Sequence, residues 1–255
     1  MSTRHFRVVL ACAGVFALGS AFAKPTEKVP NGMLPAAAEP LAYTLHFDID
    51  PAQESFDGTA EIRVQLKQAA DHLWLNGKGL SVSSASLTTT DGRQAAVRYA
   101  EVNKDGVARV DFGKPQALTL RFAYSAHYAT DLEGLYKVKR GSDAYVMTQM
   151  ESLGARKAFP GFDEPRFKTP FTVSMTVPDT AVAVANSRQL DETLSGGHKT
   201  LRFATTEKLP TYLLAVAVGP WDVTETLEMP PTAERPTPLA VRVLVPAWRT
   251  VPRGL

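Results

Sequence analysis

The sequence holds a single cysteine, Cys12, among its 255 residues. It lies in an N-terminal segment that we expect to be removed, so the mature chain would contain no disulfide bond. An excess of one charge is also lacking, because 28 Lys and Arg are balanced by 26 Asp and Glu. Loss of Arg4 and Arg7 with the same segment leaves 26 residues of each sign and a formal charge of zero. Nothing therefore points to nucleic acid or an anionic surface as a partner.

The N-terminal apolar stretch, residues 8–18, is too short for a comfortable membrane span, so no span is expected. Two arginines precede it, and Ala-Phe-Ala follows at residues 21–23. This order is typical of a secretory signal peptide that covers residues 1–23. We expect an exported protein, periplasmic or secreted. A lipoprotein anchor at Cys12 is the alternative, although Val-Leu-Ala before it fits the usual lipobox poorly.

Motifs for metal binding and for nucleophilic catalysis are missing as well. None of the five histidines is followed by glutamate, and no two stand four residues apart: His5, His46, His72, His127 and His198. The His-Glu-x-x-His pattern, which places two zinc ligands on one helix face, is therefore absent. There is no G-x-S-x-G and no mature cysteine. We expect no catalytic residue and no metal ligand in this chain.

Alternation of apolar and polar residues at period two dominates the remaining sequence and is typical of half-buried strands. Residues 41–50 and 56–66 show it most clearly and are expected to form a hairpin. Other strands are expected at residues 72–76, 80–89, 95–102, 107–112, 118–126, 144–149, 171–178, 181–188, 201–206, 212–219 and 239–245. Without a long amphipathic helix, the fold class is predicted to be all-β, a sandwich or curved sheets. It would occupy residues 39–245, after an extended lead-in at 24–38.

Residues 155–168 are interpreted as a buried structural loop. In the Pro160-Gly161 pair, proline fixes φ and glycine allows a positive φ, so the chain is expected to reverse there. The Arg156-Lys157 pair is close enough to form ion pairs with the Asp163-Glu164 doublet across that turn. Phenylalanines on both sides of the turn would anchor it in the core.

Gln149 and Glu151 flank Met150 at period two, so in a strand both side chains face the same side. An amide beside a carboxylate can hold a cation such as a protonated amine through charge-assisted hydrogen bonds. Spacing alone leaves the simpler alternative open, that these are two exposed polar residues on an edge strand.

Residues 148–168 resemble the signature segment of the N-terminal domain of the M1 zinc aminopeptidases, roughly T-Q-[FM]-E-x-x-x-A-R-[KR]-x-F-P-C-[FW]-D-E-P-x-[FM]-K. The chain departs from it at Gly161, where many members carry Cys. The expected opening hairpin resembles the family's P-x-x-Y-x-L-x-[LF]-x-x-D followed by F-x-G-x-x-x-I. Two later segments, at 72–76 and around Pro210-Thr211-Tyr212, also resemble family strands. The resemblance extends over residues 39–245 and implies a saddle-like β domain.

The resemblance also implies roles for individual residues. Gln149 and Glu151 would bind the free α-amino group of a peptide substrate, and Met150 or its neighbours would touch the first side chain. A cis peptide bond is implied between Glu151 and Ser152. The zinc cofactor would be bound by a catalytic domain that this chain lacks, since neither His-Glu-x-x-His nor G-x-M-E-N occurs.

We therefore expect the N-terminal domain of an exported zinc aminopeptidase, inactive as given, whose partners are peptides with a free N-terminus and the missing catalytic domain. Residues 246–255 would be a truncated start of the link to that domain, through a frameshift near Thr250 or at a deliberate boundary. The alternative function is a free-standing β-sandwich module that binds peptides or proteins without catalysis. A non-functional remnant that folds poorly is the third possibility.

Overall fold

The computed structural model describes residues 28–113 and 117–246. The predicted signal peptide, and all but the first residue of the expected link at 246–255, lie outside these ranges. The described residues form strands and only two short 3-10 helices, η1 (Ala155–Lys157) and η2 (Thr211–Leu213). The predicted all-β fold class is confirmed. None of the described helices has the length and apolar character that crossing a membrane requires.

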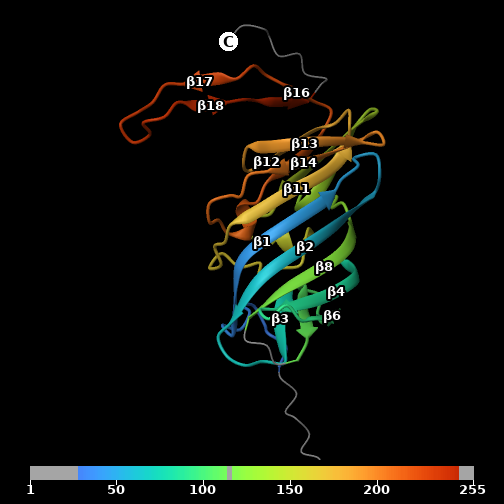
Figure 1. Ribbon diagram of the computed structural model, residues 1–255. Coiled ribbons are helices and arrows are strands. Elements are labelled where there is room, and N and C mark those ends of the chain that lie inside the picture. Colours follow the sequence, from blue (N-terminus) through green and yellow to red (C-terminus); the bar gives the residue numbers. More distant parts are fainter. Residues whose placement is uncertain (1–27, 114–116, 247–255) are drawn as a thin grey trace, which may run out of the picture.

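The largest element is an eight-stranded sheet that runs diagonally through the molecule (Figure 1). Its strands, in spatial order, are β13 (Gln189–Ser195), β14 (His198–Phe203), β11 (Phe171–Pro178), β1 (Ala38–Asp48), β2 (Ser55–Leu66), β8 (Ala117–His127), β4 (Ser81–Thr89) and β5 (Gln94–Ala96). Neighbouring strands are antiparallel except for the parallel pair β1–β11. The expected hairpin of residues 41–50 and 56–66 is confirmed as β1–β2. In both strands buried and exposed residues alternate, so one face of the sheet lines the core.

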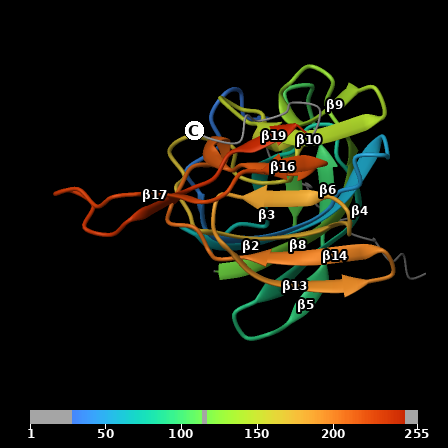
Figure 2. The ribbon, with the colours of Figure 1, turned by 90° about the horizontal axis from the view of Figure 1, so that it is seen from above.

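Two smaller sheets complete the body of the domain. One contains β12 (Val182–Ala185), β15 (Val216–Gly219), β10 (Asp143–Gln149) and β9 (Gly134–Arg140). The other contains β3 (His72–Asn76), β7 (Val107–Asp111) and β6 (Arg98–Glu101). Figure 2 shows β9, β10 and β3 on one side of the large sheet. A single hydrophobic cluster joins the three sheets, with fully buried Tyr43, Phe47, Phe122, Phe159 and Phe171.

The expected lead-in is tied to the body where the structure describes it. Leu34 is 3% exposed, and its backbone carbonyl accepts a hydrogen bond of 2.6 Å from Nη2 of Arg166. Its backbone N–H donates to Oε1 of Glu164. The segment before β1 therefore packs against the C-terminal part of the signature segment.

The C-terminal part of the chain differs from the predicted strands. The expected strand 239–245 is two short strands, β18 (Leu239–Val241) and β19 (Leu244–Pro246), because each pairs with a different partner. Those partners are β17 (Leu227–Met229) and β16 (Trp221–Val223). The expected strand 212–219 begins as η2, and the paired strand β15 starts only at Val216. Strand β13 was not predicted, because every residue in it is exposed and its sequence lacks the alternation of a half-buried strand.

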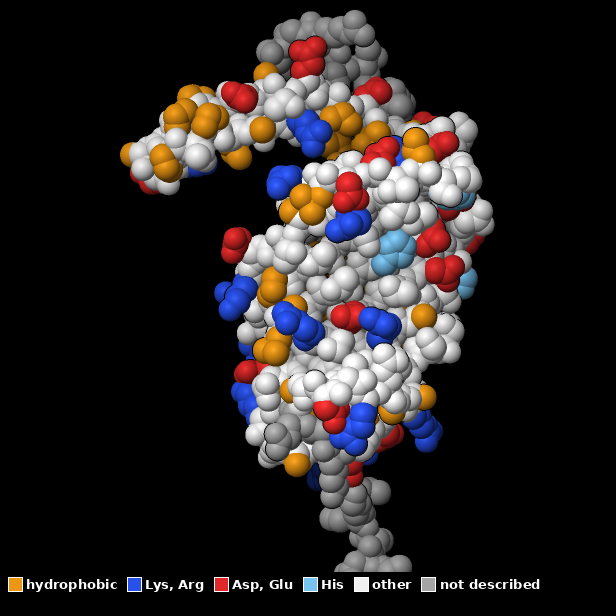
Figure 3. Space-filling view, in the orientation of Figure 1, with side chains coloured by type: hydrophobic (Ala, Val, Ile, Leu, Met, Phe, Trp, Pro, Cys, Tyr) orange, Lys and Arg blue, Asp and Glu red, His pale blue; other side chains and the backbone are white. Residues whose placement is uncertain are grey.

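A ribbon of β17 and β18 projects from the body (Figure 1). Hydrophobic side chains gather on it in the space-filling view (Figure 3). Leu227, Met229 and Leu239 are each about half exposed. They occupy alternate positions on paired strands, with Met229 opposite Leu239, so they share one face of the ribbon. This face is apolar and open to solvent among the described residues.

Candidate amine-binding turn

The candidate site is a tight turn at the end of β10. The last residue of that strand, Gln149, pairs with Gly134, the first residue of β9. The backbone N–H of Gly154 donates to the carbonyl of Met150 at 2.8 Å and closes the turn. The peptide bond between Glu151 and Ser152 is cis, which confirms that prediction. The turn is therefore anchored at both ends to defined structure.

Gln149 and Glu151 are both exposed, and they are linked by a hydrogen bond of 3.1 Å from the Glu151 backbone N–H to Oε1 of Gln149. The expected arrangement, two side chains on one face of a continuous strand, is not what brings them together, because β10 ends at Gln149. Met150 is only 2% exposed and belongs to the hydrophobic core. Contact between Met150 and a substrate stays a prediction, as do the ligand roles of Gln149 and Glu151.

The carboxylate of Glu151 forms no hydrogen bond and no ion pair with the described residues. Leu153, Arg156 and Lys157, which follow it in the chain, line a hollow of about 350 Å³, but Gln149 and Glu151 are not part of that lining. Oε1 of Gln149 has a second lone pair beyond the one that its backbone partner uses. A cation at this turn would thus meet one full negative charge and one neutral acceptor.

A buried polar network around Asp163 supports the turn from the core side. Oδ2 of Asp163 accepts from Nε of Arg156 at 2.9 Å and from the Arg156 backbone N–H at 3.2 Å. Oδ1 accepts from the hydroxyl of Thr211 at 2.7 Å. The Asp163 backbone N–H donates to Oδ1 of Asn76 at 3.0 Å. Because Arg156 and Asp163 are 9% and 2% exposed, this is a buried and well-satisfied ion pair.

The expected pairing of Arg156 with Asp163 is confirmed, but the expectation for Lys157 is wrong. Lys157 forms ion pairs with Asp131 and Glu133 instead, at 2.9 and 2.7 Å. Consecutive residues of η1 point in different directions, so when Arg156 enters the core its neighbour turns toward the surface. Glu164 pairs with Arg166, two residues along the chain, at 2.5 Å.

Gly161 does not use the positive φ that glycine allows, because its φ is not in the left-handed region. Gly161 forms a bridge with Asn76, with backbone hydrogen bonds of 2.7 and 2.8 Å. A Cβ at Gly161 would lie 3.1 Å from the ring and hydroxyl of Tyr43. Burial raises the pKa of Tyr43 far above its ordinary value, so the hydroxyl stays protonated. The oxygen of this hydroxyl accepts a hydrogen bond from the Phe162 backbone N–H at 2.8 Å. The small residue is therefore needed for close packing against Tyr43.

Two residues of the support network, Asn76 and Thr211, were not among the predicted site residues. Both lie in segments that resemble family strands, and this resemblance was the only feature of the sequence that could have drawn attention to them. Their polarity at 1% and 2% exposure indicates a specific hydrogen-bonding role. Their contact with Asp163 joins three segments that are far apart in the sequence.

The sequence that forms the sheets and the signature loop of this chain resembles that of a known protein family. The family model for the Peptidase M1 N-terminal domain matches residues 39–213. The chain belongs to this family. The puromycin-sensitive aminopeptidase of Caenorhabditis elegans is 34% identical to this M1 N-terminal domain over an alignment 213 residues long, which covers 78% of the chain and 22% of the relative.

Two further relatives are similar to the same part of the chain. Aminopeptidase M1-B of Oryza sativa subsp. japonica is 31% identical over 80% of the chain and 24% of its own length. Aminopeptidase N of Acetobacter pasteurianus is 31% identical over 74% of the chain and 54% of its own length. The M1 N-terminal domain thus spans between about a fifth and about half of the length of these three relatives.

The zinc ion that the resemblance implies does not fit the described residues of this M1 N-terminal domain. No group of three His, Cys, Asp or Glu side chains among them is arranged to hold a metal ion. His46, for instance, is engaged by Ser174, with 2.9 Å between Nδ1 and Oγ. Burial lowers the pKa of His46, although nearby Asp48 opposes that shift.

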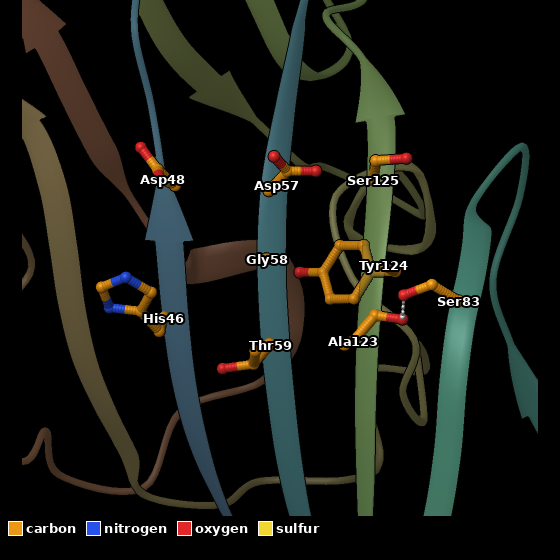
Figure 4. Close-up of a pocket in the computed structure, with 9 residues that line it drawn as sticks. All are labelled: His46, Asp48, Asp57, Gly58, Thr59, Ser83, Ala123, Tyr124 and Ser125. Atoms are coloured by element: carbon orange, nitrogen blue, oxygen red, sulfur yellow. Dashed lines mark hydrogen bonds between the residues drawn. The ribbon is translucent and has the colours of Figure 1, made fainter.

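A second hollow, of about 370 Å³, lies on the large sheet of the M1 N-terminal domain (Figure 4). Asp48 and Asp57 stand directly opposite each other on β1 and β2, and Ser125 is level with them on β8. Like charges that face each other across strands repel. His46 also lines the hollow, but the described residues contain no group of three such side chains arranged to hold a metal ion. We therefore regard the turn at Glu151 as the better candidate site.

Proposed function

We propose that this chain is the N-terminal domain of an exported zinc aminopeptidase, periplasmic or secreted, that removes N-terminal residues from peptides. In this proposal Glu151 and Gln149 bind the α-amino group of the substrate. The observation that carries it is the exposed carboxylate of Glu151, unpaired within the described residues, on a turn that is anchored at both ends. Membership of the M1 family supports the reaction class, and the names of the relatives support peptides as substrates.

The chemistry of the turn explains the choice of an end group. At neutral pH a peptide α-amine is largely protonated, and its ammonium carries three hydrogen-bond donors. Glu151 would accept one or two of these bonds with full charge assistance, and Gln149 would accept another through Oε1. Only the first residue of a peptide offers this group, so such a site selects chain termini. Met150, beneath the turn, would support the position of the first side chain.

The described residues do not hold the metal ion, so water activation in this proposal belongs to a catalytic domain outside them. We expect no hydrolysis of an alanyl anilide by the pure chain, because the site binds an amine without activating a nucleophile. The measurement is release of the coloured aniline over hours, with and without added zinc and with a chelator. Turnover that zinc supports and the chelator abolishes would contradict the expected inactivity.

Substitution of Glu151 by alanine is expected to weaken binding of a short free-amine peptide by about twofold to fivefold, since an exposed charge pair contributes up to roughly 1 kcal/mol. The measurement is a titration of ¹⁵N-labelled chain by NMR. An N-acetylated peptide of the same sequence is the matched control, and it should bind no better to the wild-type chain than to the variant. Equal affinity of both chains for the free-amine peptide would remove Glu151 from the site.

A further inference from the structure

The turn that carries Glu151 is packed against the beginning of β9. A Cβ at Gly154 would lie 3.0 Å from the Gln149 carbonyl oxygen and 3.0 Å from the Gly134 backbone nitrogen. These are backbone atoms, so there is little slack at this contact. Gln149 and Gly134 are themselves paired across β10 and β9. The position of the turn is therefore set by how the chain around Gly134 is held.

Lys157 holds this part of the chain from the other side. Its Nζ donates to Oδ2 of Asp131 at 2.9 Å and to Oε2 of Glu133 at 2.7 Å. Both carboxylates belong to the loop that leads into Gly134. A Cβ on Gly134 would lie only 2.9 Å from the Cβ of Lys157, so the lysine stem passes directly over that glycine. The lysine side chain is 22% exposed and thus partly shielded from water.

The charges of this clasp, which we define as Lys157 with Asp131 and Glu133, are stable around neutral pH. Partial burial opposes the ammonium form, but the hydrogen bonds to Glu133 and Asp131 outweigh it and raise the pKa of Lys157. The hydrogen bond from Lys157 lowers the pKa of Asp131. Lys157 and Asp131 are therefore both charged at neutral pH, where a peptide amine is also largely protonated.

Helix η1 is consequently fixed on two sides. Arg156 ties it to Asp163 in the core, and Lys157 ties it to the loop before β9. The turn with Glu151 lies between the end of β10 and the start of η1. Loss of the core tie would disturb the whole loop, whereas loss of the surface tie would free only the side of η1 that faces β9.

We propose that Lys157 is a positioning residue for Glu151: its clasp on Asp131 and Glu133 holds the amine-binding turn against β9. This inference rests on the proposed function for its effect on binding, but its effect on the turn itself is independent of that function. Lys157 does not touch the peptide. It fixes the direction in which the Glu151 carboxylate leaves the surface.

The test uses the full chain with Lys157→Gln and Lys157→Arg. We expect Lys157→Gln to weaken binding of the free-amine peptide by about threefold to fivefold, the scale of one partly exposed ion pair. Arginine keeps the charge and can bridge two carboxylates, so Lys157→Arg should restore the affinity to within about twofold. Hydrogen exchange of the Gly154 amide, which closes the turn, should be faster in Lys157→Gln and near the wild-type rate in Lys157→Arg.

Lys139→Gln is the matched control. Lys139 lies on β9 and, like Lys157, pairs with a carboxylate, that of Glu54 at 2.7 Å. That pair is at the other end of the strand, where hydrogen bonds from Lys139 and Lys137 lower the pKa of Glu54 to about 2. Its loss should leave both peptide affinity and Gly154 exchange unchanged.

The outcomes separate this inference from the proposed function. If Glu151→Ala weakens binding and Lys157→Gln does not, the positioning role is wrong and the amine site stands. If the wild-type chain binds no peptide, the proposed function fails, and the exchange rate of the Gly154 amide alone decides whether Lys157 positions the turn. An unchanged rate in Lys157→Gln overturns the positioning role, and a faster rate upholds it. Should Lys157→Gln fail to fold, Asp131→Asn removes half of the clasp and is measured in the same two ways.

Discussion

Replacement of Asp163 by asparagine is expected to lower the free energy of unfolding by about 3–5 kcal/mol, because it leaves the Arg156 guanidinium buried without its counter-charge. Nε and the backbone N–H of Arg156 both donate to Oδ2 of Asp163, and an amide nitrogen in that position would accept neither bond. Thr211 would still find an acceptor at the other position. Equilibrium unfolding in urea, followed by tryptophan fluorescence, measures the change.

The matched control is Asp111→Asn, the same chemical change in an exposed ion pair. Arg109 and Asp111 are joined at 2.6 Å, but their side chains are 32% and 42% exposed. Water can replace that interaction, so a loss of no more than about 1 kcal/mol is expected. If Asp163→Asn costs as little as the control, the buried ion pair is not what holds the signature loop.

Sequence reasoning succeeded where one residue's neighbours along the chain determine its environment. The alternation in residues 41–50 predicted which side chains of β1 enter the core, because a strand reverses its side chains at every step. The pair Arg156–Asp163 was within reach because seven residues separate its members. In both cases local geometry was enough.

Prediction from the sequence failed where a residue's contact partner comes from a distant segment of the chain. Lys157 finds Asp131 and Glu133 only because β9 lies beside β10, and nothing near Lys157 in the sequence reports that register. Gly161 was expected to serve a turn, but its small size matches Tyr43, which is more than a hundred residues earlier in the chain. The role of such a glycine depends on tertiary contact and is invisible to turn preferences.

Gly58 provides the second large expected effect, and it gives a physical reason for glycine in the F-x-G segment of the opening hairpin. Gly58 on β2 is directly opposite Tyr124 on β8. A Cβ at Gly58 would lie 2.6 Å from both Cζ and Oη of Tyr124, well inside contact distance. Tyr124 is 3% exposed and packs edge-on against Phe56, so a shift of the ring away from position 58 would disturb a packed contact.

We therefore expect Gly58→Ala to destabilise the domain by about 1–3 kcal/mol, the range for overpacking a core. The measurement is again unfolding in urea. Gly113→Ala is the control, since a Cβ there would meet no atom within 4 Å, and its effect should stay within about 0.5 kcal/mol. A Gly58→Ala variant as stable as the control would mean that the Tyr124 ring can shift at no cost.

Tyr124→Phe tests separately the two contacts that a Cβ at position 58 would make, one with Cζ and one with Oη of Tyr124. The buried Tyr124 hydroxyl has no hydrogen-bond partner among the described residues, and burial raises its pKa far above the ordinary value. Removal of this hydroxyl alone should therefore be nearly neutral or slightly stabilising. In the double variant with Gly58→Ala, Oη of Tyr124 is gone while Cζ remains close to the new Cβ. Part of the free energy of unfolding that Gly58→Ala removes should therefore be recovered, with a coupling of at least about 0.5 kcal/mol between the two substitutions. Additive effects would show that the hydroxyl is not what excludes a side chain at position 58. The constraint would then lie in the Tyr124 ring itself.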